Sequence, residues 1–237
     1  MIKTNRYPVI DLLRGLAILA MMAYHFGFDL NMQGYIAQDL NHSVTWQIAR
    51  SLILGTFLFV AGFSMALAVH QTLKKRLTRL VLIALCAALV SVVSYFMFPD
   101  SWIFFGVLHF VLLASLFCWL LIPHKKLLFT LAIALLAIGL FYQSTVFDQP
   151  LLQWLGMMTH KPVTEDYVPM LPWLGVMMIG VIIGQWALTR AQLWPLACTP
   201  SAALSPVQWL GRHSLAVYML HQPILLGALA IFGVVYQ

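Results

Sequence analysis

Long apolar runs alternate with short polar segments along this chain, and the runs predict its secondary structure. About 20 consecutive apolar residues are needed to cross a bilayer as an α-helix. Seven runs reach that length, at roughly residues 8–29, 48–70, 79–98, 102–122, 127–146, 169–188 and 209–234. The pattern predicts an all-α, polytopic transmembrane helical bundle of about seven spans, formed as a single domain over residues 1–237.

The composition excludes a soluble protein and a nucleic-acid partner. Hydrophobic residues make up 62% of the chain and charged residues only 8%, against roughly 25% charged residues in soluble domains. The basic residues stand in short clusters between the apolar runs, so they do not form a surface for nucleic acid. Three cysteines without paired spacing indicate neither a disulfide framework nor a thiolate metal site.

The distribution of positive charge predicts the orientation in the bilayer. With a cytoplasmic N-terminus, eleven of the thirteen Lys and Arg residues lie at the inner side and only Arg50 and Lys161 at the outer side. Inner loops of membrane proteins carry such an excess of positive charge. Two polar loops, at about 30–47 and 147–168, then face outward. They are either the mouth of a site or ordinary connections.

The first apolar run carries ionisable residues that are costly in a membrane. It reads RYPVIDLLRGLAILAMMAYHFGFDL and contains Asp11, Arg14, His25 and Asp29. At about 100° per residue, Arg14 and His25 differ by only about 20° around the helix axis, so all four residues share one broad stripe. Asp11 and Arg14 can pair at the cytoplasmic edge. Asp29 lies one turn beyond His25, where it could orient the imidazole. The alternatives are a structural ion pair and a structural histidine.

Further polar residues fall inside later apolar runs. His109 lies in the fourth run, and Tyr218 and His221 share a face of the last one with Ser214. Two or three histidines at similar depth indicate a shared polar cavity, although a lone membrane histidine is more often structural. We expect no metal site, because no H-x-x-x-H or H-x-x-E-H spacing is present.

A basic cluster opens the third run with the sequence KKRLTRL. Its residues Arg76 and Arg79 are one helical turn apart and could grip phosphates at a helix N-terminus. The other interpretation is that the cluster only fixes the topology.

Together these segments resemble a known family. The first-helix D-x-x-R-G motif, the basic KKRLTRL and the C-terminal LGRHSLAVYMLHQPIL are similar to the heparan-alpha-glucosaminide N-acetyltransferase catalytic-domain family. They look most like its short bacterial members, within the wider transmembrane acyltransferase superfamily. The resemblance covers nearly the whole chain. The chain has fewer helices than the lysosomal enzymes and no large outer domain, so a heparan-like substrate does not follow.

The resemblance implies acyl transfer across a bacterial inner membrane. Acetyl-CoA is then a co-substrate from the cytoplasm, with no permanently bound cofactor, and the acceptor is a sugar or envelope-glycan amine or hydroxyl outside. Arg76 and Arg79 match the basic motif associated with acyl-CoA phosphates, and Asp11 and Arg14 match the first-helix signature. The family's histidine near the outer end of the first helix corresponds to His25 or His42. We favour His25, because it shares the Arg14 face.

The expected mechanism is general-base catalysis by His25, with Asp29 beside it. His221, Tyr218, His109 and His42 are the candidates for contacting the acceptor or the oxyanion. Direct transfer and an acetyl-histidine intermediate both stay open. The rival functions are a small transporter with a proton or ion relay and a noncatalytic partner in an envelope assembly. A homodimer is the further partner considered.

Overall fold

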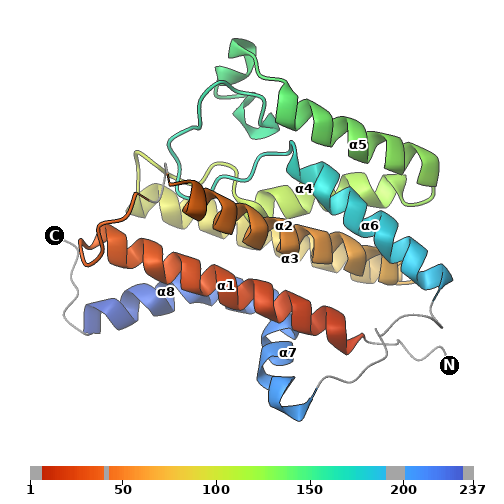
Figure 1. The fold of residues 1–237 in the computed structure, drawn as a ribbon, viewed down its shortest axis with the longest axis horizontal. Helices are drawn as coiled ribbons and strands as arrows, with labels where there is room; N and C mark the ends of the chain where they lie inside the picture. Colours follow the sequence, from red (N-terminus) through yellow and green to blue (C-terminus); the bar gives the residue numbers. More distant parts are fainter. Residues whose placement is uncertain (1–6, 40–42, 191–200, 232–237) are drawn as a thin grey trace. The chain divides into compact units, whose positions relative to one another are not determined.

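The computed structural model describes residues 7–39, 43–190 and 201–231. Every regular element in these ranges is helical (Figure 1). The α-helices are α1 (Pro8–Met32), α2 (Val44–Leu67), α3 (Leu73–Met97), α4 (Val107–Leu121), α5 (Lys125–Phe141), α6 (Trp173–Thr189), α7 (Ser205–Arg212) and α8 (Ser214–Ile231). Three short 3-10 helices accompany them: η1 (Thr145–Asp148), η2 (Gln153–Leu155) and η4 (Ala202–Leu204).

Six of the seven predicted helices are present with shifted ends. The seventh prediction, a single helix over 209–234, is wrong. The run at 209–234 contains two helices, α7 and α8, which are separated at His213. Nδ1 of His213 donates to the carbonyl of Trp209 at 2.9 Å, and the His213 amide donates to the same carbonyl at 3.1 Å, so His213 closes the last turn of α7. The polar Gln208 and Arg212 belong to α7, whereas α8 is apolar. Hydropathy alone did not reveal this break.

Four of the described helices are long and apolar enough to cross a membrane: α1, α2, α3 and α8. The apolar helices α4 and α6 are shorter. The all-helical character and the membrane class are therefore confirmed at this level. Seven spans and a cytoplasmic N-terminus stay predictions.

The chain divides into two compact units. Unit 1 comprises residues 1–60 and 192–237, and unit 2 comprises residues 61–191. Helix α2 contributes its first part to unit 1 and its last turns to unit 2. Unit 2 is therefore continuous in sequence, while unit 1 is assembled from the two ends of the chain. The single-domain organisation stays a prediction.

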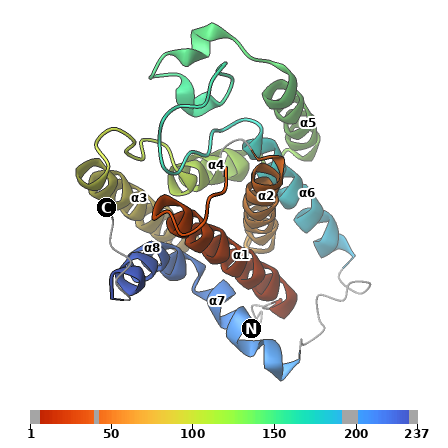
Figure 2. The ribbon, with the colours of Figure 1, turned by 60° about the vertical axis from the view of Figure 1, so that its left-hand side comes forward.

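In unit 1, α1 packs closely against α7, and α8 also lies beside α1 (Figures 1 and 2). Two glycines allow the approach. A Cβ atom on Gly15 would collide with the carbonyl of Val207, and one on Gly211 would collide with the carbonyl of Asp11. Backbone of one helix thus touches backbone of the other, which only glycine permits. The glycine of the D-x-x-R-G motif therefore has a packing role.

In unit 2, small residues again set the helix spacing. A Cβ on Gly184 of α6 would lie 2.8 Å from the Phe63 carbonyl oxygen of α2, and one on Gly175 would lie 2.8 Å from the Ala132 carbonyl oxygen of α5. These contacts fit close packing through small residues in membrane helices. Gly175 and Gly184 therefore have a packing role.

The segment between α5 and α6 is held by side-chain hydrogen bonds to its own backbone. Asp148 accepts from the Thr159 amide through Oδ1 and from the Thr159 hydroxyl through Oδ2, both at 2.8 Å. Nδ1 of His160 lies 3.5 Å from Oδ1. The hydrogen bond from the Thr159 amide is the main cause that lowers the pKa of Asp148.

This contact makes the local stability of the segment depend on pH. The pKa of Asp148 is lower in the folded segment than in the unfolded chain. Its contribution to the stability of the segment is therefore complete above the ordinary Asp pKa and is lost as the pH falls through the folded pKa. We expect the hydrogen-exchange protection factor of the Thr159 amide to fall on acidification. In Asp148→Asn this protection factor should already be lower at neutral pH, and it should change little as the pH is lowered. Equal protection and an equal pH profile in the two proteins would contradict this role.

Candidate active site

Two histidines meet in unit 1, one from α1 and one from α8. The ring centroids of His25 and His221 lie 4.9 Å apart at an interplanar angle of 61°. His221 is 6% exposed, whereas His25 is partly accessible. The ring of Tyr218 lies 5.5 Å from that of His221. Three of the predicted site residues are therefore brought together.

The backbone fixes the tautomer of His221. Nδ1 of His221 lies 2.5 Å from the carbonyl oxygen of Tyr218. A carbonyl only accepts hydrogen bonds, so Nδ1 carries the hydrogen and Nε2 is the basic nitrogen of the neutral ring. His221 is thus held with its acceptor nitrogen on the side of the ring that points away from its own backbone.

Asp29 lies one turn beyond His25, as expected, because α1 continues as far as Met32. Its side chain is 3% exposed, and Oδ1 accepts from Nε2 of Gln222 on α8 at 2.8 Å. This hydrogen bond joins α1 to α8 one turn beyond the histidine pair. A catalytic role of Asp29 stays a prediction.

Asp11 and Arg14 form the predicted ion pair at the other end of α1. Nη1 of Arg14 lies 3.2 Å from Oδ1 of Asp11 and donates to the carbonyl of Gly211 at 3.2 Å. Arg14 therefore binds the last turn of α7 as well as its neighbour on α1. This arrangement supports a structural role, and acyl-CoA binding by the pair stays a prediction.

The basic cluster of α3 borders a small pocket in unit 2. The guanidinium of Arg76 donates to the carbonyl of Val69 and stacks over the Trp119 ring, 5.1 Å from its centroid. The pocket has a volume of about 60 Å³, and its lining includes Arg76, Arg79 and the polar side chains Gln71 and Ser115. Arg79 is exposed. Two guanidinium groups at the N-terminus of α3 thus face the same small pocket, which suits an anion.

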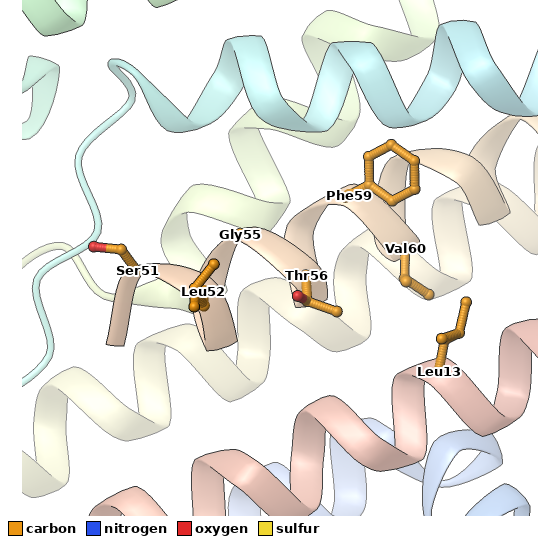
Figure 3. A pocket seen from close by; sticks show the side chains of 7 residues that line it. All are labelled: Leu13, Ser51, Leu52, Gly55, Thr56, Phe59 and Val60. Carbon is orange, nitrogen blue, oxygen red and sulfur yellow. The ribbon is translucent and has the colours of Figure 1, made fainter. Parts of the chain in front are cut away.

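An open groove runs along α2 in unit 1 (Figure 3). Its volume is about 330 Å³, and Leu13 of α1 faces it across from α2. The α2 residues that line it are Ser51, Leu52, Gly55, Thr56, Phe59 and Val60. Two hydroxyl groups therefore lie in an otherwise apolar lining.

A third histidine, His109, belongs to unit 2 and closes a turn. Its Nδ1 accepts from the Gly106 amide at 3.3 Å, and its Nε2 lies 3.1 Å from Oγ of Ser91. Because Nδ1 must accept, Nε2 carries the hydrogen and donates to Ser91. Ser91 in turn donates to the Ile103 carbonyl at 2.6 Å. Both ring nitrogens are used by the connection from α3 to α4, which supports a structural role.

The sequence pattern of a known family matches residues 6–223. Its description is Heparan-alpha-glucosaminide N-acetyltransferase, catalytic. The match covers most of the chain and includes the D-x-x-R-G segment, the basic cluster and the histidine pair. The chain belongs to this family. The resemblance noted from the motifs is confirmed, and the family indicates a membrane acetyltransferase. No curated protein and no solved structure shows a significant match.

Family membership does not decide which histidine is catalytic. His42, the rival of His25, lies outside the described residues. His25 gains support from its partner His221. Metal binding was not expected, and among the described residues there is no group of three or more His, Cys, Asp or Glu side chains that could hold a metal ion.

Sequence reasoning missed three residues, two in unit 1 and one in unit 2. Gln222 binds Asp29, Trp119 carries the Arg76 guanidinium, and Thr56 brings a hydroxyl into the groove. Gln222 directly follows His221, so its position next to a candidate residue was the available signal. No sequence spacing links Trp119 to Arg76, because they lie on different helices.

Proposed function

We propose that this chain transfers an acetyl group from cytoplasmic acetyl-CoA to a hydroxyl or amine of a sugar or envelope glycan on the outer side of a bacterial inner membrane. The observation that carries the proposal is the His25–His221 pair inside a chain that matches an acetyltransferase family over residues 6–223. Imidazole at this position is suited to move the proton that acyl transfer requires.

The donor binds first at the basic pocket of unit 2. Arg76 and Arg79 hold the phosphates of CoA, because planar guanidinium groups match phosphate oxygens with paired hydrogen bonds. Trp119 supports this role by fixing the Arg76 side chain from its other face. Acetyl-CoA is a co-substrate here and leaves as CoA after each turnover.

The groove along α2, taken by itself within unit 1, has a lining that suits a pantetheine arm. From Ser51 to Val60 it follows nine residue steps of α2, a rise of about 13.5 Å along the helix. A pantetheine arm combines alkyl segments with two amides, and the groove combines apolar walls with the hydroxyls of Ser51 and Thr56. The lining therefore matches the arm in chemistry.

In the second half of α1, His25 takes the proton of the acceptor hydroxyl or amine. The acceptor oxygen or nitrogen then attacks the acetyl carbonyl carbon. The carbon–sulfur bond then breaks, and the CoA thiolate leaves and takes up a proton. Tyr218 is a better oxyanion donor than neutral His221, because Nδ1–H of His221 is directed at a carbonyl and its Nε2 accepts. An acetyl-histidine intermediate is the alternative route.

Removing the two arginines tests the donor site. A charge-assisted hydrogen bond contributes about 1.5–3 kcal/mol, so the double variant Arg76→Ala/Arg79→Ala should weaken CoA binding by about 100-fold or more. Isothermal titration of the purified protein in detergent measures this. The matched control is Lys74→Ala/Lys75→Ala, which removes the same charge from the same turn of α3, outside the pocket lining.

The control should bind CoA within about threefold of the unchanged protein, since dispersed charge contributes less than a paired contact. Equal weakening in both double variants would mean that only the overall charge matters. If the unchanged protein neither binds CoA nor is stabilised by it, the acetyltransferase proposal is wrong.

A further inference from the structure

A buried carboxylate and a buried amide at the outer end of unit 1 are only half satisfied. Asp29 is 3% exposed and uses Oδ1 to accept from Gln222 Nε2 at 2.8 Å. Asp29 Oδ2 and Gln222 Oε1 are also buried, and neither has a hydrogen-bond partner within the described chain. Two acceptors therefore lie on neighbouring side chains without a donor.

Such groups are costly unless something binds them. Burying an acceptor without a partner is unfavourable, and nearly all buried polar groups in folded proteins are satisfied. One turn beyond Asp29, the Nε2 group of Gln33 is likewise buried and has no acceptor in the described residues. A hydroxyl group both donates and accepts, so it can donate to a free acceptor and accept from the free donor. An ammonium group only donates.

The position of these atoms relative to the histidine pair indicates the class of ligand. His25 lies one turn before Asp29 on α1, a rise of about 6 Å, and His221 directly precedes Gln222 on α8. A ligand with its reacting group at His25 therefore needs a second polar group about 6 Å away to reach Asp29. A sugar ring carries hydroxyls at such separations from any one of its substituents.

An aromatic surface lies beside the same turn of α1. A Cβ on Gly27, midway between His25 and Asp29, would lie 3.3 Å from the Trp46 indole. The Trp46 ring also packs against Tyr24 at 5.5 Å between centroids. Gly27 lies about 200° around the helix axis from both His25 and Asp29, so this aromatic surface covers the opposite face of α1 and is not part of the polar group.

We propose that Asp29 and Gln222 form a subsite that binds a hydroxyl group of a carbohydrate acceptor whose reacting amine or hydroxyl lies at His25. The inference rests on the proposed acetyl transfer and adds the residues that recognise its sugar acceptor. In this arrangement Asp29 and Gln222 set specificity and position, while His25 carries the proton transfer.

Two amines of equal ring size separate hydroxyl recognition from catalysis. Glucosamine carries hydroxyls around its amine, and cyclohexylamine has none. With acetyl-CoA and protein in proteoliposomes, the unchanged protein should prefer glucosamine in kcat/KM. Gln222→Met should reduce the ratio of the two kcat/KM values about tenfold, the effect of losing about 1.4 kcal/mol of hydrogen bonding. The loss of kcat/KM for glucosamine should come mainly from a higher KM.

The control is the same change at Gln38, an exposed residue of unit 1. Gln38→Met should keep the ratio of the unchanged protein. A structural defect in Gln222→Met lowers both kcat/KM values together and leaves their ratio unchanged, which would overturn the subsite. A ratio near one in the unchanged protein would also overturn it.

A binding measurement keeps the subsite testable if neither amine is acetylated, which would count against the proposed function. Glucosamine should then still raise the thermal unfolding temperature of the unchanged protein more than cyclohexylamine does, and this difference should vanish in Gln222→Met. Equal shifts with the two amines in the unchanged protein would overturn the subsite.

Discussion

Replacing His25 by alanine is expected to abolish acetyl transfer while CoA binding is retained. A positioned general base contributes about 10²–10⁴-fold to the rate, and no other group replaces a lost imidazole at the same atom. CoA binding should persist, because Arg76 and Arg79 belong to a separate pocket in unit 2. Transfer of radiolabelled acetyl to glucosamine and titration with CoA measure the two quantities on one protein sample.

The control for this variant is His124→Ala, which removes an exposed histidine at the N-cap of α5. It should keep both CoA binding and transfer. His221→Ala should lower kcat less than His25→Ala, because His221 is the neighbour of the base and not the base itself. An active His25→Ala protein would contradict the assignment and move the role to His42, His221 or His109.

The second large effect is expected from a single methyl group at Gly211. Its Cβ would meet the carbonyl of Asp11 and come within 2.9 Å of the Gly15 amide nitrogen, and both are backbone atoms of α1. Overpacking of this kind costs about 1–3 kcal/mol, and rigid backbone on the facing helix leaves little room to relax. Gly211→Ala should therefore lower the thermal unfolding temperature in detergent and weaken transfer with it.

Gly227 offers a matched control in the neighbouring helix α8. A Cβ at that position meets nothing within 4 Å. Gly227→Ala should be neutral or stabilising, because alanine in a helix gains about 0.5–1 kcal/mol over glycine. If both variants unfold at the temperature of the unchanged protein, the α1–α7 contact does not depend on these glycines.

Much of the fold could be predicted from local pattern. Apolar length located the helices, and helical spacing placed Asp11 and Arg14 within reach of each other, as their 3.2 Å contact confirms. The break at His213 could not be seen, because a hydropathy window averages over α7 and α8 and gives one long run. Capping by a side chain is a local hydrogen bond that leaves no trace in hydropathy.

The site was harder to predict for a different physical reason. Helical spacing shows which residues share a face of one helix, and it placed His25 and Asp29 correctly on α1. It gives no information about which residue of a second helix lies opposite, so Gln222 was missed as the partner of Asp29. His109 resembled His25 by depth, yet its turn uses both of its ring nitrogens.

The discontinuity of unit 1 has a consequence for synthesis in the cell. The first helix enters the membrane early, but the Gly211 carbonyl that accepts from Arg14 is made about 200 residues later, after all of unit 2. During that interval Asp11 is the neighbour on α1 that offsets the Arg14 charge. A chain that stops before residue 205 therefore lacks α7 and α8, and its first helix also lacks the packing against α7 and the hydrogen bond from Arg14 to Gly211.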